Sequence, residues 1–310
     1  MEFQHVPVLL EEVLEGLDIR PDGIYVDGTV GGAGHSRQIA SRLTEGGMLI
    51  GLDRDPYAVE TATERLADLP ARVVHCNYSE MREALDSLGI GNVDGVLLDL
   101  GVSSHQLDEA ERGFSYHQDA PLDMRMSQTG LSARDVVNTW EEAELIRILR
   151  DYGEEKFAPR IASAIVRARE SAPIKTTMQL AELVREAVPQ KFRREKNPCK
   201  KTFQAIRIAV NDELAPLELA VKDLADCLKP GGRICVITFH SLEDRIVKRC
   251  LKTLENPCIC PPKAPICTCG RKPSIRVLAG GAVAPSEEET ARNPRARSAK
   301  LRVAEKIGEG

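Results

Sequence analysis

Hydrophobic residues in the first hundred positions recur at two alternating spacings. Residues 9–17 carry leucine and valine three and four positions apart, which predicts an amphipathic helix. Helical patterns also appear at 35–43 and 56–69. Short apolar runs predict four strands, at 24–27, 48–53, 72–76 and 93–100. Strands that alternate with helices in this way predict βαβ units and a parallel sheet, and therefore an α/β fold.

The pattern changes in the middle of the chain and then returns. Between 104 and 212 we find no convincing strand, and helical spacing dominates, as at 143–149 and 157–166. The later part predicts a helix at 214–228, a turn at 229–232, a strand at 233–239 and a helix at 242–251. A strand at 274–278, an irregular surface segment at 280–297 and a last strand at 300–304 follow. We therefore expect a discontinuous α/β domain, 1–103 and 213–310, interrupted by a helical insertion, 104–212, that recognises the substrate.

The composition is that of an ordinary globular protein, with 42% hydrophobic and 29% charged residues. The net charge of −5 argues against a protein that coats nucleic acid non-specifically, and 4% aromatic residues argue against binding mainly by base stacking. The N-terminus lacks the basic residues of a signal peptide, and no apolar run approaches the roughly 20 residues of a membrane span. Five of the nine cysteines stand alone, which is typical of a reducing compartment. We therefore expect a cytoplasmic protein with no membrane partner.

A glycine-rich stretch, 27–36, follows the first predicted strand. Glycines between a strand and a helix let the backbone approach a ligand closely. The dinucleotide spacing fails, because Val30 and Arg37 stand where glycines are required, and no phosphate-binding Gly-Lys-Ser/Thr follows. These exclusions favour a nucleotide without a pyrophosphate.

Polar residues also follow the other predicted strands. Asp53 closes the second strand, where an acid can accept hydrogen bonds from both ribose hydroxyls. Asn77 and Tyr78 follow the third strand, and Asp99 ends the fourth. Because the carboxyl ends of parallel strands meet at one edge of a sheet, these residues predict one binding site. The alternative interpretation is that the acids cap helices and the glycines form only a tight turn.

Ten stretches of the sequence are similar to the MraW/RsmH family of methyltransferases, and they span nearly the whole chain. They are HVPVLLEE, DGTVGGAGHS, GLDRDP, LLDLGVSSHQLD, RGFSY, PLDMRM, YGEE, TFQAIRIAVN, FHSLEDRIVK and NPRARSAKLR. The resemblance implies a class I S-adenosylmethionine-dependent methyltransferase domain, Rossmann-like, with an inserted helical domain. It implies methylation of the exocyclic N4 of a cytidine in the decoding centre of small-subunit (16S) ribosomal RNA, within an assembled or nearly assembled small subunit.

The resemblance also implies a set of contacts to S-adenosyl-L-methionine. They fall on Ala33, Gly34, His35, Asp53, Tyr78, Asp99 and Gln106. The sequence departs from the family beside the last of these, because His105 stands where many members carry proline.

Asp99 is the catalytic candidate for methylation of an amine. A carboxylate that accepts a hydrogen bond from N4 would favour the reactive, pyramidal amine and could later take the proton. Related amino methyltransferases carry an Asp-Pro-Pro-Tyr-like motif here, whereas this chain has Asp99-Leu100-Gly101-Val102, without the aromatic residue. Asp99 could instead bind the cofactor or be structural. His240 closes the fifth main strand and is a second candidate for the chemistry, with a satisfied structural histidine as the alternative.

A basic run at 190–201 lies in the helical insertion and precedes Arg207. Such a run, which includes Arg193 and Arg194, can neutralise RNA phosphates although the net charge is negative, and the alternative is a solvated loop. The same run contains Pro198-Cys199, a dipeptide common in cytosine-C5 methyltransferases, whose cysteine attacks the ring. We favour a loop cysteine, because a C5 nucleophile belongs near the fourth strand.

The remaining four cysteines form two pairs, Cys258 with Cys260 and Cys267 with Cys269. Their spacing fits either a four-thiolate zinc site or a metal-free cysteine-rich hairpin. Methyl transfer needs no metal, so we assign none to the active site. Two other functions stay open: a non-catalytic ribosome-assembly factor with a nucleotide pocket, and a methyltransferase that acts on a protein or a small molecule.

Overall fold

The computed structural model describes residues 7–193, 197–261, 266–278 and 280–308. The chain divides into two compact units. One, the sheet unit, combines Met1–Gly101 with Leu214–Gly310, and the other, the helical unit, is the continuous segment Val102–Glu213. Each is described by itself below. No helix in the described ranges has both the length and the apolar character that a membrane span requires.

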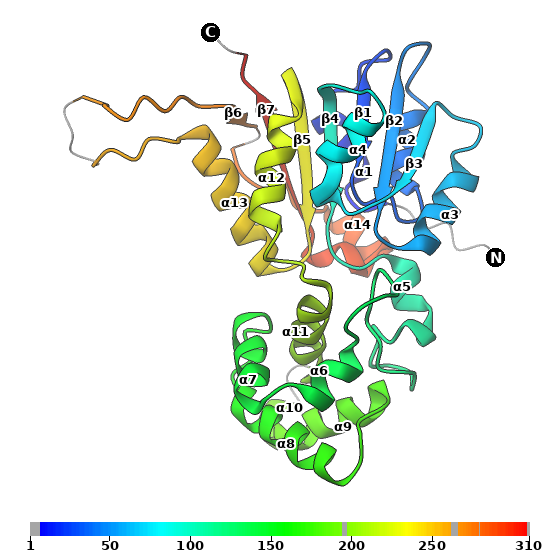
Figure 1. The fold of residues 1–310 in the computed structure, drawn as a ribbon, viewed down its shortest axis with the longest axis vertical. Helices are drawn as coiled ribbons and strands as arrows, with labels where there is room; N and C mark the ends of the chain where they lie inside the picture. The colour runs from blue at the N-terminus through cyan, green and yellow to red at the C-terminus, as the bar shows by residue number, and fades with distance from the viewer. Residues whose placement is uncertain (1–6, 194–196, 262–265, 279, 309–310) are drawn as a thin grey trace. The chain divides into compact units, whose positions relative to one another are not determined.

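The sheet unit is built on one seven-stranded sheet with the order β3-β2-β1-β4-β5-β7-β6 (Figure 1). The first five strands pair in parallel, and β7 is antiparallel to both β5 and β6. The strands are β1 (Ile24–Asp27), β2 (Met48–Asp53), β3 (Ala71–His75), β4 (Val93–Asp99), β5 (Leu228–Thr238), β6 (Ile275–Val277) and β7 (Lys300–Lys306). The predicted α/β fold with a parallel sheet is confirmed, together with the two late strands.

Helices pack on both faces of this sheet because its strands are apolar on both sides. Neighbouring side chains of β4 point in opposite directions, so Leu97 belongs to one core and Leu98 to the other, and both are fully buried. The core around Leu97 includes residues of α1 (Leu10–Leu17), α2 (Gly34–Ala40) and α3 (Pro56–Arg65). The core around Leu98 includes residues of α4 (Met81–Ser87), α12 (Leu217–Asp226) and α13 (Ser241–Glu255).

Two local predictions for the sheet unit are wrong. The expected turn Lys229-Pro230-Gly231-Gly232 lies inside β5, where the register against β4 shifts between Val93 and Gly95. The expected irregular segment 280–297 contains helix α14 (Glu287–Arg292) and most of the 3-10 helix η3 (Pro294–Ser298). Tertiary contacts explain the second error, because Glu289 Oε1 accepts a 2.7 Å hydrogen bond from Leu9 N, and Ala296 is fully buried.

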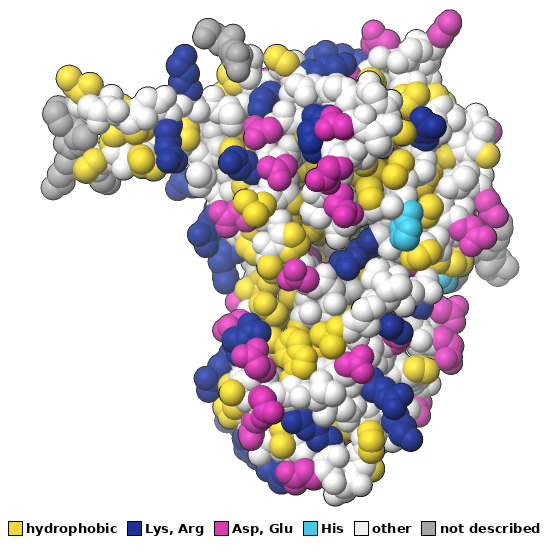
Figure 2. All heavy atoms as spheres, in the orientation of Figure 1, with side chains coloured by type: hydrophobic (Ala, Val, Ile, Leu, Met, Phe, Trp, Pro, Cys, Tyr) yellow, Lys and Arg dark blue, Asp and Glu magenta, His cyan; other side chains and the backbone are white. Residues whose placement is uncertain are grey.

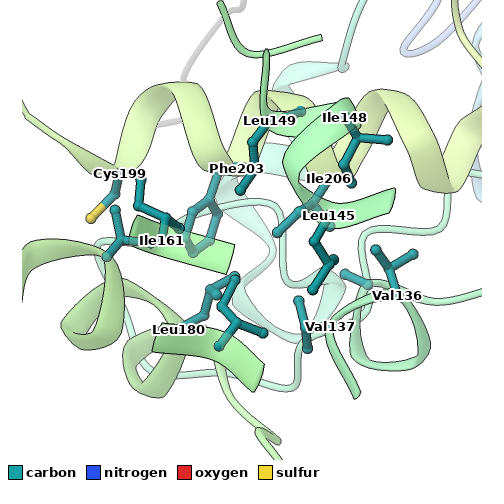
Figure 3. Packing of buried hydrophobic residues seen from close by; sticks show 14 of the residues in the cluster. Val136, Val137, Leu145, Ile148, Leu149, Ile161, Leu180, Cys199, Phe203 and Ile206 are labelled. Atoms are coloured by element: carbon teal, nitrogen blue, oxygen red, sulfur yellow. The ribbon is translucent and has the colours of Figure 1, made fainter. Parts of the chain in front are cut away.

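The helical unit has its own hydrophobic core. Its helices are α5 (Ser104–Asp108), η2 (Ala110–Arg112), α6 (Ala133–Thr139), α7 (Glu142–Asp151), α8 (Ala158–Ser171), α9 (Thr177–Ala187), α10 (Gln190–Arg193) and α11 (Cys199–Asn211). Figure 3 shows side chains of α6, α7, α8, α9 and α11 meeting at its centre, among them Leu145, Phe203 and Ile206. Among its described residues this unit contains no named strand, as the hydrophobic pattern predicts.

Charges of both signs are distributed over the visible surface. Figure 2 shows Lys and Arg interspersed with Asp and Glu. Mixed surface charge of this kind suits the small net charge of the chain, −5. A nucleic-acid contact would therefore depend on local groups of basic side chains.

Candidate functional site

The polar residues predicted as one site lie at the carboxyl ends of neighbouring parallel strands. The chain runs from β1 outward to β2 and β3 on one side, whereas β4 and β5 lie on the other side of β1. Open α/β sheets bind ligands at the carboxyl ends of their strands, where the strand order reverses. In this sheet that point lies between β1 and β4.

Asp27, at the end of β1, organises the glycine-rich loop. Its carboxyl group is 1% exposed and accepts hydrogen bonds from Ser36 Oγ at 2.7 Å and from Thr29 N at 3.1 Å. Burial raises its pKa, while these hydrogen bonds act in the opposite direction. Sequence reasoning did not select this residue for the site. Its only signal was its place at the end of a strand.

The loop that follows bends through left-handed backbone at two positions. Gly31 has a φ of 49° and Ala33 a φ of 62°, and Ala33 forms the N-cap of α2. A Cβ atom on Gly28 would lie 2.5 Å from Leu98 Cδ2 and 3.0 Å from Tyr78 Cβ. A Cβ on Gly34 would lie 2.7 Å from Pro7 Cγ. The backbone therefore packs too closely for side chains at these two glycines.

Asp53, at the end of β2, holds this loop through one of its oxygens. Oδ2 accepts a 2.9 Å hydrogen bond from Gly31 N, and Oδ1 accepts one of the same length from Asp55 N. Burial raises the pKa of Asp53 to about 6, although the two backbone hydrogen bonds lower it. A carboxylate has about four acceptor sites, so Asp53 can still accept hydrogen bonds from a ligand.

Tyr78 follows β3 and begins the short 3-10 helix η1 (Tyr78–Glu80). Asn77 is its N-cap, and Glu80 completes a capping box by accepting from Asn77 N. Asn77 thus has a structural role as a helix cap. Tyr78 is half-buried beside the loop that carries Gly28.

Asp99, at the end of β4, differs from the other two carboxyl groups. Its backbone N donates a 2.6 Å hydrogen bond to Thr29 Oγ1, which ties β4 to the loop after β1. Its Oδ1 is buried and accepts no hydrogen bond from the described residues. Burial raises its pKa to about 6, nearby His35 lowers it, and Asp27 and Glu243 raise it further. The side chain is still 27% exposed, so a ligand can reach it.

His35 lies between the N-terminal segment and Asp99. Its Nε2 is 2.9 Å from the Val8 carbonyl oxygen, and its Nδ1 is 3.7 Å from Asp99 Oδ2. Because a carbonyl oxygen only accepts, Nε2 must carry hydrogen, and Nδ1 is the nitrogen that faces the carboxyl group. The ring is 6% exposed and lies in the first turn of α2, beside Asp99.

His240 follows β5 and is the N-cap of α13. Its Nδ1 accepts from Glu243 N at 3.5 Å, and its Nε2 lies 3.0 Å from Glu243 Oε1. Glu243 is 2% exposed, and its Oε2 accepts a hydrogen bond from Phe239 N at 2.9 Å. The histidine therefore lies against a buried carboxylate, on the strand next to Asp99, and its buried Nε2 makes no hydrogen bond to the described residues.

Gln106 belongs to the helical unit. Its Oε1 accepts from Ser103 N at 3.1 Å, and its backbone N donates to Ser103 Oγ at 3.2 Å, which together form the capping box of α5. Its side chain is 5% exposed. The sheet unit alone brings together the other predicted residues: Ala33, Gly34, His35, Asp53, Tyr78, Asp99 and His240.

The sheet is doubly wound and has an antiparallel seventh strand, a glycine-rich loop follows β1, and an acid ends β2. Together these features define an S-adenosylmethionine-dependent methyltransferase. The sequence matches the MraW methylase family over residues 2–307. The chain belongs to this family. The fold, the enzyme class and the cofactor that the resemblance implied are confirmed.

Close relatives carry a specific name. Proteins named ribosomal RNA small subunit methyltransferase H from Ruminiclostridium cellulolyticum and Clostridioides difficile are each 54% identical, over 99% of this chain and 100% of the relative. One from Brevibacillus brevis is 56% identical over 99% of both chains. A solved structure described as a putative rRNA-methylase from Clostridium thermocellum covers 99% of both chains with a TM-score of 0.48 and 13% identity.

Proposed function

We propose that this enzyme transfers a methyl group from S-adenosylmethionine to the exocyclic N4 of a cytidine in the decoding centre of small-subunit ribosomal RNA. The names of its relatives support the substrate class. The observation that carries the chemistry is Asp99, a carboxyl group at the strand switch point with a buried oxygen to which no described residue donates. Such an oxygen can accept a hydrogen bond from a substrate amine.

The residues at the strand ends fit the cofactor. Asp53 keeps acceptor capacity for the ribose hydroxyls, and the loop from Gly28 to Gly34 offers a closely packed backbone beside it. Tyr78 lies next to the same loop, with its Cβ 3.0 Å from where a Cβ on Gly28 would be. When bound, S-adenosylmethionine supplies an activated methyl group on a sulfonium. Ala33, Gly34, His35, Asp53 and Tyr78 of the sheet unit are the residues we propose to hold it.

Asp99 would act on the amine. Because its pKa lies at about 6, most of it is ionised at neutral pH, so it can accept a hydrogen bond from N4 and then the proton. A hydrogen bond at N4 draws the amine lone pair out of conjugation with the ring and makes the nitrogen a better nucleophile. His35 would keep the Asp99 carboxyl group in place.

His240 is proposed to contact the base. Its Nδ1 accepts a hydrogen bond from Glu243 N, and its buried Nε2 faces the Glu243 carboxylate without a hydrogen bond to the described residues. The base would have to leave its stack to reach this edge of the sheet, as in other enzymes that modify bases. A positioned imidazole next to Asp99 would help to hold it there.

The cysteine chemistry required for C5 methylation finds no support among the thiols outside the 258–269 cluster. Cys199 is not a loop cysteine: it starts α11, is fully buried and contacts the Ala181 carbonyl at 3.5 Å. Burial raises the pKa of all five of these thiols, which are Cys76, Cys199, Cys227, Cys235 and Cys250. The pKa is about 11 for Cys76 and about 12 for Cys235. A nucleophilic thiolate needs the opposite shift.

The helical unit is proposed to bind the RNA through exposed lysines of the basic run. Lys191 and Lys200 are exposed, and their charges can contact phosphates. Arg193 is engaged within the unit, because its guanidinium donates to the Val188 and Glu186 carbonyl oxygens. Arg194, the other arginine singled out, lies outside the described residues. We propose that the assembled or nearly assembled small subunit is the substrate.

The first test is methyl transfer by the purified enzyme to small subunits that lack the modification, followed by nucleoside analysis. We expect N4-methylcytidine as the product, and a lower yield from naked RNA than from assembled particles. The Asp99→Asn variant should bind cofactor and lose turnover by roughly two to four orders of magnitude, the range for loss of a general base. Asp94→Asn, at the other end of β4, is the matched control and should retain turnover.

Each alternative has its own outcome. A product methylated at C5 would contradict the N4 assignment. Cofactor and ribosome binding without any methyl transfer would favour the non-catalytic assembly factor. Transfer to a ribosomal protein in place of RNA would overturn the proposed substrate class.

A further inference from the structure

The four clustered cysteines lie on an extended arm that connects α13 to β6 (Figure 1). We call residues 256–274 the cysteine arm; its described parts are 256–261 and 266–274. Cys258 and Cys260 lie on the outgoing part, and Cys267 and Cys269 on the returning part. The arm belongs to the sheet unit but contributes none of the strand-end residues described above.

The four sulfur atoms form one compact group. Cys267 Sγ lies 3.6 Å from Cys258 Sγ, 3.9 Å from Cys260 Sγ and 3.5 Å from Cys269 Sγ. Cys269 Sγ lies 3.8 Å from Cys258 Sγ. All four atoms lie within 4.8 Å of one another. The two pairs, seven residues apart, therefore meet at a single point.

These separations match a tetrahedron of thiolates around one ion. A Zn–S bond is about 2.3 Å long, and four such ligands in tetrahedral positions are about 3.8 Å apart. A disulfide would require about 2.05 Å between two sulfurs. In a four-iron cluster each thiolate binds a different iron, which places the sulfurs farther apart than ligands of one shared ion.

A backbone donor supports the charge that such a site would carry. Thr268 N donates a 3.4 Å hydrogen bond to Cys260 Sγ. Four thiolates and one divalent cation leave a net charge of −2, and N–H donors to the sulfurs stabilise that charge. Arg271 and Lys272, both exposed, follow Cys269 after Gly270 and add positive charge nearby in the sequence.

The described residues of the arm form no hydrophobic core. None of them is buried, and none is in a helix or a strand. Ile259 and Ile266 are 66% and 75% exposed, so no apolar core forms around them. Ordering a backbone costs conformational entropy at every residue, and a segment without a core needs a cross-link to offset that cost.

We propose that Cys258, Cys260, Cys267 and Cys269 bind one zinc ion as four thiolates, and that this ion holds the two parts of the cysteine arm together. The site is structural, because all four positions of the tetrahedron are taken by protein ligands and none is left for water or substrate. The proposal is independent of the methyl transfer chemistry.

The test is elemental analysis of the full-length protein, purified without chelator or metal resin. We expect one zinc per chain, and we expect the Cys258→Ser/Cys267→Ser double variant to lose it. Cys76→Ser, which alters a thiol outside the cluster, should keep the full zinc content. Replacement of zinc by cobalt should give the intense visible absorption of tetrahedral cobalt thiolate in the parent protein and not in the double variant.

Limited proteolysis tests the role of the ion. Removal of zinc with a chelator should make the cysteine arm cleavable between α13 and β6 while the rest of the chain stays intact. Metal-free protein with four titratable thiols in the cluster, or with disulfides between them, would overturn the proposal. Zinc that remains in the double variant, or iron in its place, would also overturn the assignment.

Discussion

Three carboxyl groups lie at the carboxyl ends of β1, β2 and β4, and they differ in the donors that surround them. Asp27 is buried among hydroxyl and backbone donors of its own loop. Asp53 accepts one backbone hydrogen bond on each oxygen and keeps further acceptor sites. Asp99 has a buried oxygen that accepts none from the described residues. In the proposed mechanism, loop organisation, ligand binding and acceptance of a substrate proton therefore fall to three separate acids.

The pH dependence of methyl transfer should follow Asp99. Its pKa of about 6 predicts that single-turnover rates at saturating cofactor fall about tenfold per pH unit below that value, as the carboxyl group takes up a proton. The residual rate of Asp99→Asn should lack this inflection, because the amide does not titrate. Rapid-quench measurements between pH 4.5 and 8 would test this. An unchanged inflection in the variant would assign it to another group.

Substitution of Asp99 and of Asp94, its matched control on the same strand, should change the free energy of unfolding in opposite directions. The raised pKa of Asp99 means that its contribution to stability is present below 3.8 and is lost as pH rises through about 6. Burial alone would raise the pKa of Asp94, but the ion pair with Lys229 and the hydrogen bond from Ile24 N lower it overall. At pH 7, Asp99→Asn should therefore raise the free energy of unfolding by about 1–3 kcal/mol, whereas Asp94→Asn should lower it. Denaturant titrations would measure both.

At the scale of the element, the basic run at 190–201 contains residues that stabilise the fold and residues that are exposed and can bind a partner. Arg193 of α10 donates to the Val188 and Glu186 carbonyl oxygens at the end of α9, where helix carbonyls lack partners within the helix. Lys191 lies on the same short helix and is exposed. From composition alone, Arg193 and Lys191 would both be predicted to bind phosphates. Only their contacts in the structure distinguish them.

Arg193→Ala should lower the free energy of unfolding by about 1–3 kcal/mol, because two carbonyl groups lose a charged donor. Lys191→Glu combined with Lys200→Glu should leave stability nearly unchanged and weaken RNA binding, with a shallower dependence of affinity on salt. Thermal denaturation and filter binding at several salt concentrations would measure the two effects. Equal RNA affinity for the double lysine variant and the parent would contradict the proposed RNA contact.

Local sequence patterns predict some secondary-structure elements of this protein and miss others. Strands β1, β2 and β4 were predictable because each is a largely apolar run that ends at an aspartate. Helix α14 has six residues and three glutamates in its first turn, so it has no apolar stripe. Its contact with Leu9 joins residues 280 positions apart, which no local pattern records. The same limit applies to Asp27, because its place after a strand was visible but its donors were not.

At the scale of the whole molecule, the two units have separate cores. The core of the helical unit consists only of residues within Val102–Glu213, and both cores of the sheet unit consist only of residues outside that segment. The interruption of the α/β pattern at 104–212 was visible in the sequence, because strand spacing stops and helical spacing takes its place. The strand-end site was predictable from the same pattern, since parallel strands share one edge.

Separate cores predict separate unfolding. Ile148→Ala, a fully buried residue of the helical unit, should lower the stability of that unit by about 2–5 kcal/mol. Ile50→Ala, fully buried in the sheet unit, should do the same there. We expect calorimetry of the parent protein to show two transitions, and each variant to shift a different one. A single transition that both variants shift equally would show that the units unfold together.

The nesting of one unit within the other also sets the order in which the chain can fold during synthesis. The helical unit is one continuous segment, so all its core residues have been made before Leu228, where β5 begins. Strand β4 pairs with β1 on one side and with β5 on the other. The edge that faces β5 stays unpaired until the entire helical unit and β5 have been translated. A central strand thus spends much of translation as an open edge, which is the state most prone to pairing with another chain. Rapid folding of the local contacts in the helical unit would bring the two halves of the sheet into reach as soon as β5 leaves the ribosome.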